Sequence, residues 1–82
     1  MVKVKFFAVL KALVGKEEIS IEMKEGSTLQ QLIEQLKEDL PPLVDIMQKG
    51  GILISVNQEV LGKEAVIKDG DEVAFLPPFA GG

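Results

Sequence analysis

The sequence predicts an α+β fold in which one main helix packs across a mixed sheet of four to five strands. Apolar and polar residues alternate near both ends of the chain, a pattern typical of strands that bury one face. Between these ends, residues 29–40 have apolar residues at helical spacing. The length of 82 residues, with 46% hydrophobic and 27% charged residues, suffices for one core and therefore for one domain.

The first part of the chain predicts two strands joined by a turn. Residues 2–10 alternate, and the face that we expect to be buried comprises Val2, Val4, Phe6, Ala8 and Leu10. Phe7 and Val9 fall on the opposite face. Residues 13–18 predict a turn, and residues 19–23 alternate again. We therefore expect a hairpin at this end of the chain.

The main helix is expected to begin near Ser27. This residue precedes Gln30 by three positions, which is the spacing of a capping box at a helix start. One apolar stripe follows, formed by Leu29, Leu32, Ile33, Leu36 and Leu40. We expect this stripe to cover the sheet rather than to bind a partner helix. Pro41-Pro42 should end the helix, and residues 43–49 predict a short helical turn.

The second half of the chain predicts three more strands. Residues 52–56 are almost continuously apolar, as in a strand buried inside a sheet. Residues 60–66 form a weaker segment, expected at the sheet edge. Residues 72–76 predict the last strand, with Val73 and Phe75 on one face. The first and last strands could pair side by side, although alternation alone does not establish which strands are neighbours.

The last six residues predict an extended tail, so that residues 1–76 form the domain and residues 77–82 leave it. Pro77 and Pro78 have no backbone N–H and cannot continue a sheet ladder. Fully stretched, six residues reach about 20 Å. After Ala80 the chain continues into Gly81 and Gly82, which lack a Cβ and are slim enough to enter a narrow channel of another protein. We expect the Gly82 α-carboxylate to be presented there.

The composition excludes most kinds of catalytic and binding site. The chain has no His, Cys, Trp, Tyr or Arg, so neither an ordinary zinc site nor a Ser/His/Asp or Cys/His nucleophile can be built. A net charge of −4 gives no basic footprint for nucleic acid. No stretch is long enough to span a membrane, and we expect a cytoplasmic protein. We also expect no metal site, no cofactor bound by this chain and no catalytic side chains of its own.

A single helix leaves one face of the predicted sheet uncovered. Phe7, Val9, Ala74 and Leu76 are expected on that face. Val60 or Leu61, together with Phe79, could join them near the tail. An apolar patch at this place predicts a docking surface for another protein. The partner-binding candidates are Phe7, Val60, Leu76 and Phe79, and Pro77 and Pro78 are expected to aim the tail.

Three blocks of sequence match a known family. They are Val4-Lys5-Phe6-Phe7-Ala8 with Leu13-Val14-Gly15, then Val56-Asn57-Gln58, and finally the run DGDEVAFLPP followed by two residues and Gly-Gly. The closing run is the most specific of the three. Through these blocks the chain resembles the small subunits of molybdopterin synthase, which are ubiquitin-like β-grasp sulfur carriers. Residues 38–51 match that family little.

The resemblance implies a mechanism based on the C-terminus. An adenylating activating enzyme would use ATP and Mg²⁺ to adenylate Gly82, and sulfur from a donor would then displace AMP and leave a thiocarboxylate. A large catalytic subunit would take up the tail and pass the sulfur to a pterin precursor of the molybdenum or tungsten cofactor. The active assembly in the family is a heterotetramer of two small and two large subunits.

Two other functions remain open from the sequence. A ubiquitin-like protein modifier would join Gly82 to lysines of other proteins through the same activated terminus. A plain interaction domain would leave the tail inert. A sulfur carrier for thiamine synthesis is a close variant of the first function, disfavoured by the longer chain and by Pro77-Pro78.

Overall fold

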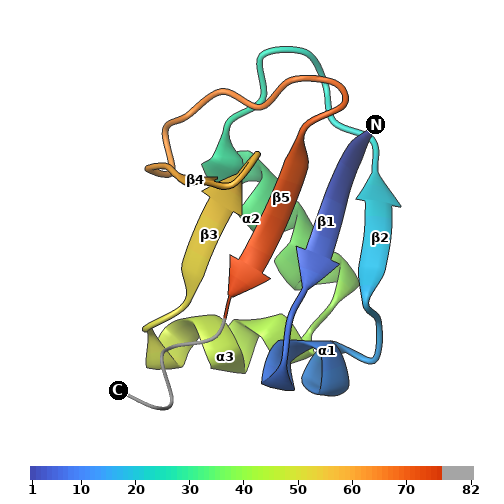
Figure 1. Ribbon diagram of the computed structural model, residues 1–82, viewed down its shortest axis with the longest axis vertical. Coiled ribbons are helices and arrows are strands. Elements are labelled where there is room, and N and C mark those ends of the chain that lie inside the picture. The colour runs from blue at the N-terminus through green and yellow to red at the C-terminus, as the bar shows by residue number, and fades with distance from the viewer. Residues whose placement is uncertain (77–82) are drawn as a thin grey trace.

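The computed structural model describes residues 1–76 as one five-stranded sheet with three helices (Figure 1). The strands are β1 (Val2–Phe6), β2 (Glu18–Ile21), β3 (Leu53–Val56), β4 (Glu59–Val60) and β5 (Glu72–Leu76). The helices are α1 (Val9–Val14), α2 (Leu29–Asp39) and α3 (Pro42–Lys49). The strand order is β2-β1-β5-β3-β4, so the last strand lies in the centre of the sheet.

The sheet is mixed because its first and last strands run parallel. β1 pairs with β5 in parallel, with Val4 opposite Val73 and Phe6 opposite Phe75. The other neighbours, β1 with β2, β5 with β3 and β3 with β4, are antiparallel. The sequence allowed the first and last strands to be neighbours but did not establish this. The structure shows that they do pair. The expected mixed sheet of four to five strands is confirmed as well.

The core lies between one face of the sheet and α2. Figure 1 shows α2 crossing behind the sheet, with α1 and α3 near the end where β1 and β5 finish. The predicted stripe supplies four buried side chains of α2, which are Leu29, Leu32, Ile33 and Leu36, while Leu40 is partly buried. The rings of Phe6 and Phe75 meet them from adjacent strands with centroids 5.6 Å apart. The interpretation of this stripe as core is confirmed.

The predicted start of the main helix was wrong by one residue. The N-cap is Thr28, whose side-chain oxygen accepts a hydrogen bond from Gln31 N at 3.3 Å. Gln31 Oε1 in turn accepts from Thr28 N at 2.8 Å, which completes a capping box. Ser27 instead donates its hydroxyl to the Lys24 carbonyl at 2.6 Å. Two adjacent hydroxyl residues, each followed by Gln three positions later, made the register ambiguous.

The first strand is shorter than predicted, and a helix follows it. β1 ends at Phe6, and residues 9–14 form α1 in place of the expected strand end and turn. The change of direction occurs at Ala8, whose φ of 53° and ψ of −128° fall outside the strand region. Leu10 remains buried, as predicted, but reaches the core from a helix. Val9 therefore belongs to α1 and not to the sheet.

The second half of the chain follows the prediction with two corrections. α3 spans eight residues after Pro41 and is longer than the expected turn. The predicted edge strand over residues 60–66 reduces to the two-residue strand β4. Between β3 and β4, the turn residues Asn57 and Gln58 both have positive φ, of 52° and 71°. No helix within residues 1–76 is long and apolar enough to cross a membrane.

Candidate docking surface

The sheet face opposite α2 is not covered by any helix of the described chain, and it faces the viewer in Figure 1. Directly paired residues of neighbouring strands point to the same side of a sheet. The ladder therefore places Lys5, Ala74, Ser55 and Val60 in one row across this open face. Leu53 and Leu76 form the next row. The open face thus combines apolar residues of β3, β4 and β5 with charged residues of β1.

A shallow depression of about 400 Å³ occupies this face. Its lining consists of Lys5, Phe7, Ser55, Gln58, Val60, Glu72, Ala74 and Leu76. Three of the four side chains predicted to bind a partner, Phe7, Val60 and Leu76, are therefore brought together. Phe79, the fourth, lies outside the described residues. Val9, expected on this face at the sequence level, is in α1.

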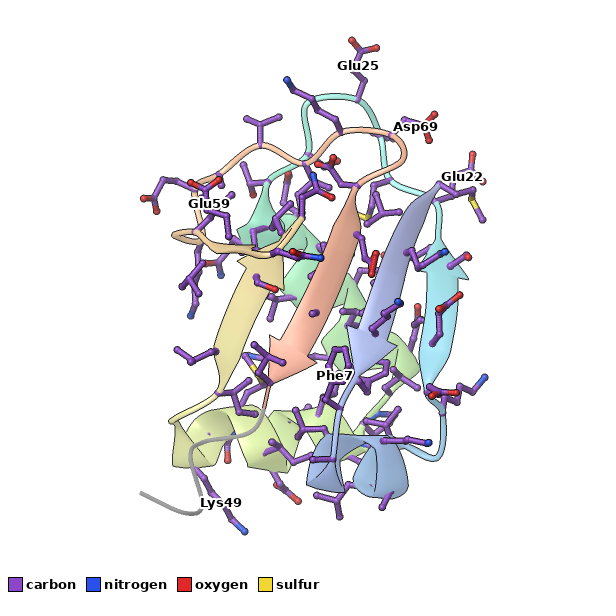
Figure 2. The ribbon with its side chains drawn as sticks, in the orientation of Figure 1. Phe7, Glu22, Glu25, Lys49, Glu59 and Asp69 are labelled. Atoms are coloured by element: carbon purple, nitrogen blue, oxygen red, sulfur yellow. The ribbon has the colours of Figure 1, made fainter. Side chains whose placement is uncertain are left out.

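Phe7 is placed by an unusual backbone turn. Its N–H donates to the Phe75 carbonyl at 3.4 Å, and its own carbonyl accepts from Leu10 N at 3.1 Å. The second bond closes a four-residue turn, and Ala8 at its second position has dihedral angles near those of a type II′ turn. That position normally requires glycine. The side chain of Phe7, 43% exposed, lies beside the ends of β1 and β5 (Figure 2).

Leu53 is an apolar member of this surface that the sequence interpretation missed. It is 48% exposed and lies opposite Leu76, whereas Ile54 and Val56 point into the core. The nearly continuous apolar run suggested burial on both faces. The polar Ser55 within that run was the available signal. Residues two positions apart in a strand point to the same side, so Ser55 indicates that Leu53 faces the open side as well. We define the docking surface as Phe7, Leu53, Val60, Ala74 and Leu76.

Charged pairs border the docking surface on its β1 and β2 side. Lys5 Nζ lies 3.0 Å from Glu72 Oε1, and Lys3 Nζ lies 3.9 Å from Glu18 Oε2. The hydrogen bond and the negative charge of Glu72 raise the pKa of Lys5 above its usual value. These groups are solvent-exposed, so the pairs contribute little to stability. These pairs place positive and negative charges alternately along one border of the apolar docking surface.

The described chain ends at this surface. Leu76, the last residue of β5, belongs to the docking surface, and the next residue along the chain is Pro77. The predicted tail residues Pro77, Pro78, Ala80, Gly81 and Gly82 lie outside the described residues. A protein that binds the docking surface would therefore contact the domain next to the residue from which the tail continues.

Comparison with known proteins places this geometry in a family. The model of the ThiS family matches residues 4–82. The molybdopterin synthase sulfur carrier subunit of Haemophilus influenzae is 34% identical over 82 residues, with complete coverage of both chains. The subunit of the same name from Escherichia coli is 33% identical over 82 residues, again with complete coverage.

Solved structures agree with the sequence comparison. A molybdopterin converting factor subunit 1 from Pyrococcus furiosus has a TM-score of 0.85 at 32% identity, covering 95% of this chain and 97% of its own. Small archaeal modifier protein 1 from Methanosarcina acetivorans has a TM-score of 0.82 at 31% identity, covering 99% and 95%. A complex of subunits 1 and 2 of the molybdopterin-converting factor from Helicobacter pylori contains a chain with a TM-score of 0.72 at 26% identity, covering 99% and 97%.

The predicted fold and the predicted resemblance are both confirmed. The parallel pair β1 and β5 at the centre of the sheet, with α2 across one face, is the ubiquitin-like β-grasp arrangement. The relatives match the chain over its full length, including its final residues. The chain therefore belongs to the ThiS family and, within it, to the family of molybdopterin synthase sulfur carrier subunits.

Proposed function

We propose that this chain is the sulfur carrier and small subunit of molybdopterin synthase. The observation that carries the proposal is the end-to-end match to sulfur carrier subunits of that enzyme. The apolar docking surface next to the end of β5 supports it, because a carrier must bind the enzymes that load and unload its tail. The chain itself supplies the reacting terminus, and the catalytic side chains belong to its partners.

The chemistry takes place at the Gly82 carboxylate. A carboxylate is a poor electrophile, so it first attacks the α-phosphorus of ATP and releases pyrophosphate. A sulfide equivalent from a donor then attacks the acyl adenylate and expels AMP, which leaves a thiocarboxylate. Its sulfur attacks an electrophilic carbon of the pterin precursor and displaces an oxygen substituent. Water then cleaves the acyl C–S bond, which leaves the sulfur on the precursor and regenerates the carboxylate. This route requires no cysteine, which this chain lacks.

The proposal requires two kinds of protein partner. One is the large catalytic subunit, and the solved complex of subunits 1 and 2 from Helicobacter pylori supports this assignment. The other is an adenylating activating enzyme, which would hold the ATP and Mg²⁺. We place both partners on the docking surface, so that Gly81 and Gly82 reach the active site of whichever partner is bound. We also propose that the chain works in the cytoplasm. Two small and two large subunits would form the synthase.

A second function is favoured by a specific observation. Small archaeal modifier protein 1 of Methanosarcina acetivorans is 31% identical to this chain, and the match covers 99% of this chain. In a modifier, a lysine amine instead of sulfide attacks the acyl adenylate of Gly82 and forms an amide bond. Both functions use the same activated terminus and differ only in the nucleophile.

Intact-mass analysis after incubation with the activating enzyme, ATP, Mg²⁺ and a sulfur donor tests these functions. A sulfur carrier gains the mass difference between one sulfur and one oxygen at its C-terminus. Branched adducts on lysines identify a modifier, and an unchanged mass leaves an inert interaction domain. A variant lacking Gly82 is the matched control: it should show no mass gain and unfold at the same denaturant concentration as the wild type.

A further inference from the structure

Two amide side chains stand next to each other in the turn between β3 and β4, and the structure uses only one of them. Asn57 Nδ2 donates to Asp71 Oδ1 at 3.0 Å, and its Oδ1 accepts from Glu72 N at 3.0 Å. Its backbone N–H donates to the Glu72 carbonyl at 2.8 Å. Asn57 therefore fastens the turn to the start of β5, and its role in the fold is complete.

Gln58 has no comparable role in the fold. Its side chain is exposed and makes no hydrogen bond with any of residues 1–76. It nevertheless lines the depression on the open face together with Val60 and Phe7. An unused amide in this position can donate one hydrogen bond and accept another.

The backbone at Gln58 is unfavourable for this residue type. Its φ is 71°, and it occupies the second position of a two-residue hairpin loop in which both residues have positive φ. Such loops prefer Asn followed by Gly, because only Gly adopts this conformation without strain. Strain of this kind is found at binding sites, where a side chain is needed in spite of its cost.

The position of Gln58 also separates it from the tail. Val56, just before the turn, lies opposite Val73, whereas Leu76 lies opposite Leu53 at the other end of β3. The three-residue step from Val73 to Leu76 spans about 10 Å of strand. A bond at Gln58 would thus give a partner a second fixed point, well away from the tail, and so set its orientation on the open face.

We propose that Gln58 is a specificity-determining residue that hydrogen-bonds a main-chain amide group of the large subunit. This inference rests on the function proposed above. A main-chain amide group suits Gln58, because its C=O can accept a hydrogen bond from the side-chain NH₂ or its N–H can donate one to the side-chain oxygen. Val60, two residues further along the chain and in the same depression, would help to exclude water from this bond once the partner covers it.

Binding of the full-length chain to the purified large subunit, measured by titration calorimetry, tests the inference. Gln58→Ala removes the amide and retains a side chain at the strained position, whereas Gln58→Gly removes both the amide and the strain. We expect the Kd to rise about three- to tenfold in each variant, the cost of one neutral hydrogen bond. Gln35→Ala on α2, which covers the opposite face of the sheet, is the matched control and should bind as the wild type does.

Stability distinguishes this role from a structural one. We expect Gln58→Gly to raise the denaturant midpoint of unfolding and to weaken binding. If Gln58 served only the fold, its replacement would change stability and affinity in the same direction. Wild-type affinity in Gln58→Ala would overturn the inference. If only Gln58→Gly lost affinity, the cause would be the freedom of its backbone and not the missing amide. If the wild-type chain itself fails to bind the large subunit, the proposed function falls together with the inference.

Discussion

The two faces of this sheet are built by the same strands and differ in what covers them. On the face toward α2, residues such as Val4, Val73 and Phe75 are completely buried. On the other face, their sequence neighbours Lys5, Ala74 and Leu76 line a shallow depression. Folding alone explains the apolar character of the first face. It does not explain why Phe7, Leu53 and Val60 are exposed on the second face, and this exposure is the reason why we propose that face as a binding surface.

The largest expected effect is on stability and comes from the covered face. Phe75→Ala removes a fully buried ring that packs on Phe6 in the centre of the sheet. We expect the free energy of unfolding to fall by about 3–5 kcal/mol, a large part of the total for a small domain. Urea unfolding followed by circular dichroism measures it. The neighbouring Leu76→Ala, on the open face, should cost about 1 kcal/mol at most, and equal losses would contradict the distinction between the faces.

The open face should show the reverse, a large loss of binding with little loss of stability. Phe7→Glu and Leu76→Glu each place a charge in the docking surface, and we expect the affinity for the large subunit to fall at least about 30-fold. Surface plasmon resonance measures this change. Val66→Glu is the matched control, because Val66 is 54% exposed and lies outside the depression. Unchanged affinity in both Phe7→Glu and Leu76→Glu would exclude this face as the binding site.

The turn at Ala8, which connects the buried Phe6 to the exposed Phe7, allows a smaller effect to be predicted. Ala8→Gly relieves the positive φ, and we expect it to raise the free energy of unfolding by about 0.5–1 kcal/mol. Ala12→Gly, in the middle of α1, should instead lower it by about 1 kcal/mol. Thermal unfolding of the two variants side by side provides the measurement. A destabilised Ala8→Gly would show that the turn is not strained.

The smallest expected effect concerns the charged border of the open face. Because Glu72 raises the pKa of Lys5, the pair favours folding below the usual lysine pKa, and this contribution disappears as the pH rises through the higher folded value. We expect the pKa of Lys5 to fall toward its ordinary value in Glu72→Gln, as measured by NMR titration of the lysine side chain. The unfolding midpoint should hardly change, since both groups are exposed. An unchanged pKa would contradict the pairing.

Much of the covered face could be predicted from the sequence, because burial on one side leaves a periodic pattern. The stripe from Leu29 to Leu36 and the alternation around Val73 correspond to core positions in the structure. The start of the helix was harder to place, since Ser27 and Thr28 offer equivalent capping residues and only tertiary contacts choose between them. The order of the strands also needed the structure, because alternation shows which side of a strand is buried but not which strand lies next to it.

The open face was predicted less completely for a physical reason. A binding surface needs no period, so Leu53 was hidden within an apolar run and Phe7 was placed on an over-long strand. The turn that ends β1 depends on the φ and ψ angles of Ala8. A glycine at this position would have predicted the turn, whereas an alanine does not. Phe7, Val60 and Leu76, expected on one face, do line a single depression. Their role in binding a partner stays a prediction.

The central position of β5 has a mechanical consequence. A force applied at Leu76 along the axis of β5 would act on the whole strand. This strand is hydrogen-bonded to β1 on one side and to β3 on the other, so both ladders are loaded in shear, all bonds together, instead of being peeled apart one at a time. An edge strand pulled in the same way would be held by one ladder only. If a partner draws on the residues after Leu76, the domain would therefore resist that force through two ladders at once.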